Sequence, residues 1–165
     1  MPVKLITAWR IVKTKHAATA FSGEGATRAS GRWHSRGTPV VYAAESRALA
    51  VLELMVHLEA DELLKHYRLI SATFDESLVK VLQVADLPAD WKRGRPPVAT
   101  KHIGDDWIAS NKSVVLKVPS VLVPAENNYL LNPNHPEFAG VRISVEREFR
   151  YDLRMFARRT PRANA

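Results

Sequence analysis

Residues 31–58 read GRWHSRGTPVVYAAESRALAVLELMVHL, and this stretch decides the fold that the sequence predicts. Its pattern predicts a short strand, a tight loop, a second strand and a helix. The loop is the turn cluster at 35–39, where Gly accepts a positive φ and Pro fixes φ. The run at 40–44 is β-branched and aromatic, which is typical of a buried strand. Glu45-Ser46 then offers an N-cap to an apolar helix over 47–58.

A carboxylate, Glu53, lies in the middle of this apolar helix. On a helical wheel the apolar side chains cover nearly the whole circumference, which predicts a buried helix. A buried carboxylate is costly unless it is paired, so a partner should face Glu53. The helix alone leaves two interpretations open. Glu53 is either structural, at a half-exposed edge or paired with His57 at i+4, or a functional acid, because perturbed acids gather at active sites.

The composition indicates one soluble globular domain. A chain of 165 residues is long enough to bury about 70% of its unfolded surface. The absence of cysteine excludes disulfides, a thiolate nucleophile and Cys-based metal sites. No apolar run approaches the ~20 residues of a membrane span, and charge interrupts the N-terminal segment too early for a secretory signal. We therefore expect a cytoplasmic protein without membrane contact.

The formal net charge is +7 and the pI is about 9.9. Arg outnumbers Lys, and Arg suits bidentate recognition of phosphate or carboxylate groups. This favours an anionic partner, which could be a nucleic acid, a nucleotide or an acidic protein. Charge alone does not choose among these. Part of the excess lies in residues 142–165, where solvated charge is the simplest explanation.

The rest of the chain predicts an α+β fold with a mainly antiparallel sheet. The expected strands are 3–12, 67–75, 78–84, 113–118, 141–145 and 147–151. A helix over 98–111 is expected to be interrupted near Gly104. FSGEGA, residues 21–26, reads as a loop without the spacing of a dinucleotide fingerprint. No repeat or linker divides the chain, so we expect a single domain at 1–159 and a disordered tail at 160–165.

The sequence contains no pattern typical of a metal site or a hydrolase triad. The His residues are scattered, and no GxSxG elbow is present, so we expect no bound metal. What remains is a set of four residues: Arg32, Tyr42, Glu53 and Ser120. Arg can fork onto a pyrophosphate, Tyr can stack on a flat ring, and Glu can face positive charge at an anomeric carbon. Such a set suits a phosphorylated sugar–base substrate.

The motifs around these residues resemble those of the RES-domain toxin family. The matching pieces, in the family's order, are FSGEGA (21–26), SGRWHSRGTPVVYAAESRALAVLELMVHL (30–58), IGDDW (103–107), VPSVLVPAENNYLLNP (118–133) and HPEF (135–138). The family's arginine, tyrosine, glutamate and serine fall on Arg32, Tyr42, Glu53 and Ser120. Where the family often has GGRWN, this chain has Ser30 and His34, a departure that concerns fine substrate contacts.

The resemblance implies an ADP-ribosyltransferase-like fold, a split and mainly antiparallel sheet with flanking helices that clamps NAD. Family members are toxins of type II toxin–antitoxin modules that deplete NAD by hydrolysis or phosphorolysis, and some attach ADP-ribose to a protein. An Xre-like antitoxin is the implied partner and blocks the active site. NAD is then the substrate, phosphate is a candidate acceptor, and no cofactor is required. Direct nucleic-acid contact is not expected outside the antitoxin complex.

The resemblance also implies a role for each residue. Arg32 would hold the NAD pyrophosphate, and Tyr42 would pack on the nicotinamide or its ribose. Glu53 would stabilise an oxocarbenium-like state while nicotinamide leaves, and Ser120 would orient Glu53 or a substrate oxygen. Asn127 is a further candidate for NAD binding. Water or phosphate would then attack the anomeric carbon.

Three alternatives stay open. One is a mono-ADP-ribosyltransferase that acts on a protein target. Another is a basic nucleic-acid-binding protein, in which Trp33 and Trp91 stack on bases beside the cations of residues 92–95. The third is a catalytically inactive regulatory member, against which the four retained residues argue.

Overall fold

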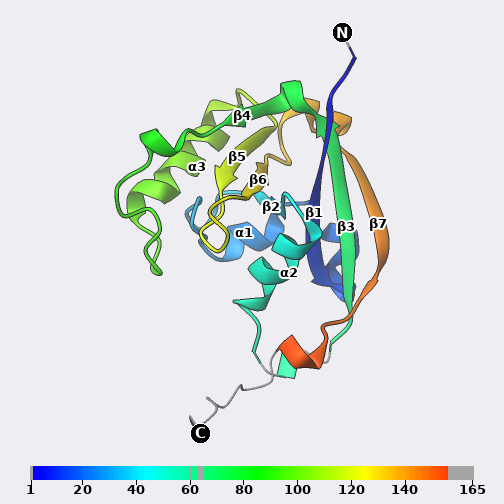
Figure 1. The fold of residues 1–165 in the computed structure, drawn as a ribbon. Coiled ribbons are helices and arrows are strands. Elements are labelled where there is room, and N and C mark those ends of the chain that lie inside the picture. The colour runs from blue at the N-terminus through cyan, green and yellow to red at the C-terminus, as the bar shows by residue number, and fades with distance from the viewer. Residues whose placement is uncertain (1, 60, 63–64, 156–165) are drawn as a thin grey trace, which may run out of the picture.

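The computed structural model describes residues 2–59, 61–62 and 65–155, so the tail expected at 160–165 lies outside the described residues. Within these ranges the strands form one seven-stranded sheet in the order β4-β5-β6-β2-β1-β3-β7 (Figure 1). The strands are β1 Leu5–Lys13, β2 Val41–Ala44, β3 Tyr67–Asp75, β4 Val79–Val81, β5 Val115–Pro119, β6 Asn127–Leu131 and β7 Arg142–Phe149. Every pairing is antiparallel except β4–β5, which confirms the predicted α+β class.

Three α-helices of the described chain pack around this sheet. They are α1 Glu24–Arg28, α2 Arg47–Met55 and α3 Val98–Ser110. Short 3₁₀ turns connect the elements, at η1 Thr14–Thr19, η3 Glu76–Leu78, η4 Val84–Asp86, η5 Pro136–Gly140 and η6 Leu153–Met155. Figure 1 shows α3 beside β4 and β5, and α2 close to β1 and β2. Separate apolar clusters bury α2 against β1, β2 and β3, and α3 against β5 and β6.

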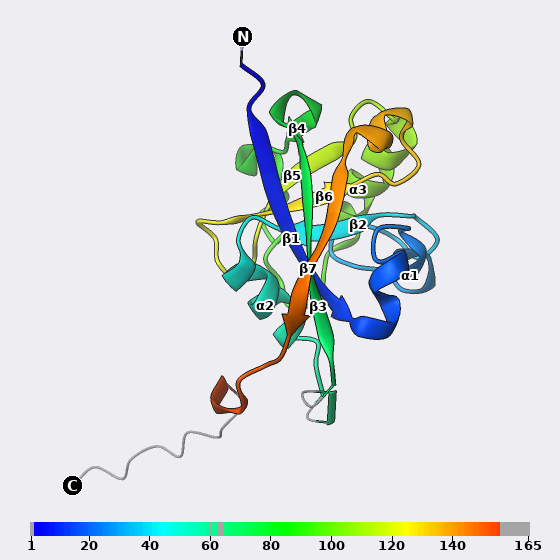
Figure 2. The same cartoon turned by 90° about the vertical axis from the view of Figure 1, so that its right-hand side faces the viewer.

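The sheet is nearly divided between β1 and β2. β1 pairs with β3 along its whole length, from Leu5 to Lys13, but shares only the pair Trp9↔Ala44 with β2. β1, β3 and β7 run steeply in Figure 2, whereas β2 crosses behind them almost horizontally. The predicted split sheet is therefore present, with β7-β3-β1 on one side of the division and β2-β6-β5-β4 on the other.

The central stretch follows the prediction in its second half and departs from it in its first half. Ser46 caps α2 as expected, because its side chain accepts a hydrogen bond from the Leu49 N–H at 3.1 Å. The strand expected at 31–34 is wrong. Gly31 and His34 form only an isolated bridge, which closes a tight loop.

The prediction that the helix is buried all round is also wrong. Only Leu49 and Ala50 of α2 are fully buried, and Val56, just after the helix, is 54% exposed. The reason is geometric, since α2 packs one side against the sheet and its apolar outer side stays half-exposed.

Other departures have simple physical reasons. The α3 helix runs unbroken through Gly104, where a Cβ would overlap the carbonyl oxygen of Trp33, so the glycine allows close packing rather than a break. Part of the loop expected at 21–26 is helical, as the start of α1. The two final strand signals form the single strand β7, which is irregular opposite Leu69 and Ile70. β6 was not predicted.

Candidate functional site

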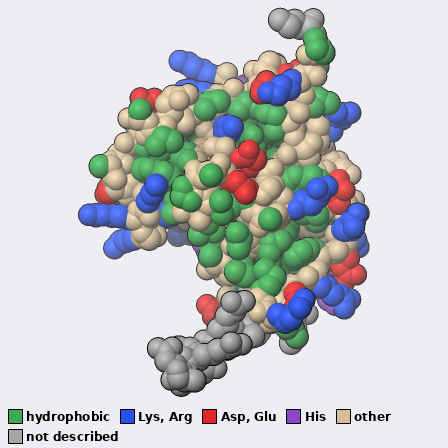
Figure 3. All heavy atoms as spheres, in the orientation of Figure 1, with side chains coloured by type: hydrophobic (Ala, Val, Ile, Leu, Met, Phe, Trp, Pro, Cys, Tyr) green, Lys and Arg blue, Asp and Glu red, His purple; other side chains and the backbone are tan. Residues whose placement is uncertain are grey.

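A cleft of about 1080 Å³ opens where the sheet is divided. Its walls come from β1 and β2, from α1 and α2, from the loop at 30–33, and from Gly94, Pro96, Pro119, Val121 and Leu122. Arg32, Tyr42 and Glu53 all line it. Figure 3 shows a few acidic side chains near the centre of the face seen in Figure 1, surrounded by hydrophobic side chains, with most Lys and Arg nearer the edges. The volume is that of a small-molecule site.

The Glu53 carboxylate accepts hydrogen bonds from two neutral side chains, one that follows β5 and one on β6. Its Oε1 accepts hydrogen bonds from Ser120 Oγ at 2.9 Å and Asn128 Nδ2 at 2.7 Å. Among the described residues, Oε2 accepts no hydrogen bond, and His57 forms no ion pair with this acid. Glu53 therefore lies at a half-exposed position with one oxygen open to a ligand.

Ser120 is fully buried at the end of β5. Besides donating to Glu53, its Oγ accepts the backbone N–H groups of Leu122 at 3.1 Å and Val123 at 3.2 Å. These bonds fix the hydroxyl in a local turn. Of the two roles expected for Ser120, the geometry favours orientation of Glu53 over contact with a substrate oxygen.

Arg32 holds a neighbouring loop with two of its nitrogens. Nη1 donates to the carbonyl oxygen of Trp91 at 2.6 Å, and Nη2 donates to that of Arg93 at 2.9 Å. Burial lowers the pKa of Arg32, and the nearby Glu53 carboxylate opposes this shift. A guanidinium has five N–H donors. Arg32 therefore anchors the 91–93 segment and retains donors for an anion in the cleft.

The hydroxyl of Tyr42 is already engaged by the protein. It accepts the Trp33 N–H at 3.2 Å and lies 2.7 Å from His34 Nδ1. Burial raises the pKa of Tyr42, so the hydroxyl stays protonated at neutral pH. Tyr42 can therefore offer a ring face to a ligand, but its hydroxyl is not free for acid–base chemistry.

Arg10 is a cleft residue that the sequence interpretation missed. It lines the cleft from β1, and its Nη1 donates to the carbonyl oxygen of Tyr42 at 2.7 Å. Its Nε is buried and has no hydrogen-bond partner among the described residues. Burial lowers the pKa of Arg10 to about 10, so the side chain is still charged at neutral pH. A buried donor without a partner is rare and is suited to an anionic ligand. The available signal was a charge in the middle of a predicted strand.

Adjacent asparagines on β6 have different partners. The structure does not place Asn127 with the other candidates, because its N and Nδ2 donate to Glu45 Oε2 at 2.6 and 2.7 Å, and it does not line the cleft. Asn128 lines the cleft and binds Glu53. Successive side chains on a strand point to opposite faces, so Asn128 faces the cleft and Asn127, the residue expected from the sequence, points away from it.

The nucleic-acid alternative needs Trp33 and Trp91 to be accessible to bases, and the structure buries both. Trp33 and Trp91 are only 2% and 6% exposed, and their ring centroids lie 6.2 Å apart in one apolar cluster with Trp107. Lys92 Nζ lies over the Trp91 ring, 5.3 Å from its centroid. Neither indole can stack on a base without unpacking this cluster.

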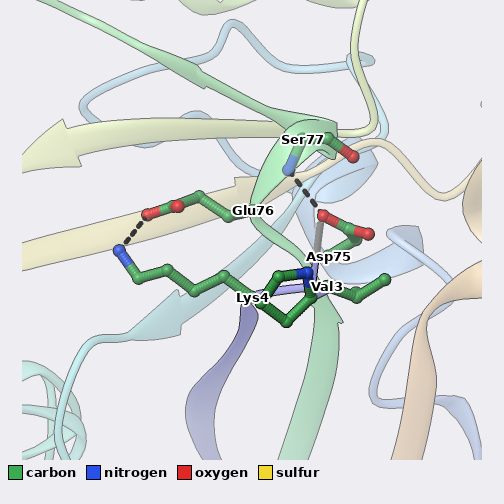
Figure 4. Close-up of a pocket in the computed structure, with 6 residues that line it drawn as sticks. Val3, Lys4, Asp75, Glu76 and Ser77 are labelled. Atoms are coloured by element: carbon green, nitrogen blue, oxygen red, sulfur yellow. Dashed lines mark hydrogen bonds and ion pairs between the residues drawn. The ribbon is translucent and has the colours of Figure 1, made fainter.

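A second, shallower hollow lies where β1 begins and β3 ends (Figure 4). Lys4 Nζ binds Glu76 Oε1 at 2.7 Å, and the Asp75 carboxylate accepts the Ser77 N–H at 2.8 Å. These contacts close a surface turn, so we assign no chemistry to this hollow.

No group of three or more His, Asp or Glu side chains among the described residues could hold a metal ion. No helix in the described part of the chain is long and apolar enough to cross a bilayer.

Known proteins resemble this chain over most of its length. A family model described as the RES domain matches residues 7–154. A protein named Toxin Res from Photorhabdus laumondii is 40% identical over 148 residues, which are 89% of this chain and 95% of that protein. A protein named Prs ADP-ribosylating toxin, from a Sphingobium species, is 37% identical over 152 residues, with 89% and 94% covered.

A solved structure supports the fold. A chain in the crystal structure of the M. tuberculosis MbcT–MbcA toxin–antitoxin complex aligns with a TM-score of 0.70 at 17% identity, and the alignment covers 93% of this chain and 88% of that chain. At this identity the likeness concerns the fold alone, and it agrees with the ADP-ribosyltransferase-like architecture expected from the sequence.

Proposed function

This chain belongs to the RES-domain family, and from that membership we propose that it is the toxin of a type II toxin–antitoxin module that cleaves the nicotinamide–ribose bond of NAD. The single observation that carries the proposal is one cleft in which a carboxylate with a free oxygen lies in the field of an arginine. NAD is a substrate in this proposal, and no further cofactor is required.

The cations of the cleft suit a dinucleotide. NAD carries its negative charge on a pyrophosphate, which guanidinium groups bind well. Arg10 offers an unpartnered Nε, and Arg32 retains donors beyond those that hold the 91–93 loop. Tyr42 lines the same cleft as these cations and Glu53, and its ring offers a face to the nicotinamide or its ribose.

Glu53 supplies the electrostatic part of the reaction. The C1′–N bond breaks, nicotinamide leaves with the electron pair, and positive charge develops on the ribose ring. Ser120 and Asn128 fix Oε1, so Oε2 can bind ribose hydroxyls and stabilise this charge. A water molecule then attacks C1′ and loses a proton to give ADP-ribose, or phosphate attacks to give the corresponding sugar phosphate.

Mono-ADP-ribosylation of a protein is the second candidate activity. The Sphingobium relative is named an ADP-ribosylating toxin, and the same cleavage serves when a protein side chain attacks C1′ in place of water. We also propose a cytoplasmic location and an Xre-like antitoxin that blocks the cleft. The toxin–antitoxin complex in which the structural neighbour was solved supports an antitoxin partner, and the charge of +7 would favour an acidic contact surface.

The test is incubation of the purified chain with NAD, with and without inorganic phosphate, and separation of the products by liquid chromatography and mass spectrometry. Free nicotinamide is the expected product, and its partner product identifies the acceptor. A reaction without enzyme serves as the blank. A steeply salt-dependent affinity for RNA without nicotinamide release would instead favour the nucleic-acid alternative.

A further inference from the structure

We propose that His34 is a positioning residue that holds the Tyr42 ring in the cleft through a hydrogen-bond acceptor, and that protonation of His34 removes this acceptor. The inference rests on the proposed function, because its effect is read in NAD cleavage.

The two ring nitrogens of His34 have different partners, and these assign the tautomer. Nε2 lies 2.8 Å from the carbonyl oxygen of Ala29, which can only accept, so Nε2 carries the proton. In the neutral ring Nδ1 is then an acceptor. It lies 2.7 Å from the Tyr42 hydroxyl, which therefore donates to it. The same hydroxyl accepts the Trp33 N–H.

The loop is shaped to allow this contact. His34 is only 4% exposed, and its ring centroid lies 5.5 Å from that of Tyr42. A Cβ at Gly31 would lie 2.8 Å from the Tyr42 hydroxyl oxygen and equally close to His34 Nδ1. The Gly31 N–H donates to the His34 carbonyl oxygen at 3.1 Å and closes the loop. The hydroxyl end of Tyr42 is thus anchored, which leaves the ring to face the cleft.

Protonation of His34 conflicts with this arrangement. A cationic ring has N–H groups at both nitrogens, so Nδ1–H would point at the Tyr42 O–H. The hydroxyl hydrogen would have to turn away, and the structure shows no second acceptor for it among the described residues. Protonation of His34 would therefore weaken the anchor of the Tyr42 ring.

Some charged groups around His34 stabilise its cationic form and others destabilise it. On α3, the Asp105 carboxylate accepts hydrogen bonds from the Ser35 N–H and the Thr38 hydroxyl and attracts the cationic form of His34. Lys101, also on α3, donates to Ser30 Oγ on the other side of the loop. Arg32, on the loop itself, opposes the cation as Lys101 does. Of the four residues of β2, Tyr42 alone is titratable, and its phenol is neutral.

A double-mutant cycle tests the coupling. Tyr42→Phe keeps the ring and removes the hydroxyl, whereas His34→Ala removes the acceptor. Nicotinamide release is measured for the wild type, both single variants and the double variant. We expect each single variant to lose about tenfold in kcat and the double variant to lose no more than the worse single one, because both remove the same hydrogen bond. Additive losses would overturn the proposal.

His34→Asn provides a matched variant that keeps an acceptor near the Nδ1 position and does not titrate. We expect it to recover activity that His34→Ala loses and to lose less kcat on acidification than the wild type does. An equal decline in the Asn variant would contradict the proposed acceptor role. Circular dichroism of each variant verifies that it folds.

Histidine ¹⁵N NMR gives a readout that is independent of activity. We expect the Nε2–H tautomer of His34 in the wild type, and a changed Nδ1 chemical shift in Tyr42→Phe, which removes the hydroxyl that donates to Nδ1. An Nδ1–H tautomer would overturn the inference. Failure of the wild type to release nicotinamide would overturn the proposed function itself, whereas release with additive mutant losses would overturn only the role of His34.

Discussion

The two walls of the cleft are built in different ways. On one wall, Glu53 is bound by the side chains of Ser120 and Asn128. On the other wall, Arg32 is bound by backbone carbonyl groups, and α3 packs directly on its loop through Gly104. Substitutions on the Glu53 wall should therefore change chemistry more than stability. Substitutions on the Arg32 wall should change both, because the backbone itself is involved.

Glu53→Gln gives the largest expected effect and tests the first half of this comparison. Glutamine can still accept from Ser120 and Asn128, but it removes the charge that faces the developing cation. Nicotinamide release should fall by about 10²–10³-fold, the typical cost of one preorganised electrostatic contact. The melting temperature should change by only a few degrees.

Glu45→Gln is the matched control for this substitution, because Glu45 binds Asn127 outside the cleft. It should leave turnover within about twofold of the wild type. Normal turnover in a folded Glu53→Gln variant would show that this acid has only a structural role.

The sequence pointed to Glu53 and to the α+β class for a physical reason. A carboxylate in an apolar helix is an anomaly visible in one dimension, and strand and helix periods are local properties. Arg32, Tyr42 and Ser120 are ordinary residues in isolation; they became candidates because, together with Glu53, they suit a phosphorylated sugar–base substrate, and the family resemblance then gave each of them a role. Arg32 and Tyr42 line one cleft, and Ser120 is bonded to Glu53 beside it; this arrangement depends on how β1 and β2 diverge, which local patterns do not encode.

Other features could not be predicted because they depend on tertiary register. Asn128 rather than Asn127 faces Glu53 because of the side of the sheet on which α2 packs. The burial of Trp33 and Trp91 arises from α3 and the 91–93 loop, which are distant in sequence. Arg10 is notable only once its Nε is seen to be buried without a partner.

Arg10→Met is expected to have the next largest effect and separates binding from stability. If Arg10 binds the NAD pyrophosphate, its loss should raise KM about 10–100-fold, the equivalent of one or two charge-assisted hydrogen bonds. The free energy of unfolding should change little, because Met removes the cost of a buried cation with an unpartnered Nε but also loses the hydrogen bond from Nη1 to the Tyr42 carbonyl oxygen.

Enzyme kinetics and urea unfolding measure the two quantities for Arg10→Met. Arg10→Lys, which keeps the charge, should lie between the wild type and Arg10→Met in KM. A loss of stability at unchanged KM would assign Arg10 a structural role and remove it from the cleft's chemistry.

Asn128→Ala and Asn127→Ala compare the two faces of β6. Asn128→Ala removes one of the two donors to Glu53 and should lower kcat about tenfold, the equivalent of about 1.4 kcal/mol. Asn127→Ala removes contacts to Glu45 outside the cleft and should have a smaller effect on kcat. The reverse order would indicate that Asn127 contacts substrate, as the sequence first led us to expect.

Asp105→Asn has the smallest expected effect and tests the Arg32 wall. Burial opposes ionisation of this group, but hydrogen bonds from Ser35 and Thr38 prevail and lower the pKa of Asp105. A carboxyl whose pKa is lowered by folding stabilises the protein above its unfolded pKa of about 4, and this contribution is lost as the pH falls through the folded value. The variant should therefore be less stable than the wild type by about 1 kcal/mol at neutral pH, since the carboxylate is partly solvated.

The difference between Asp105→Asn and the wild type should shrink below about pH 4, which urea unfolding at several pH values can measure. The exposed neighbour Asp106 provides the control Asp106→Asn, which should show neither the loss nor its pH dependence. Because Asp105 holds the loop that carries Arg32 and His34, its loss should also lower nicotinamide release a few-fold. If stability fell while turnover stayed normal, the loop's backbone would not control the geometry of this wall, and the two walls would differ less than their contacts indicate.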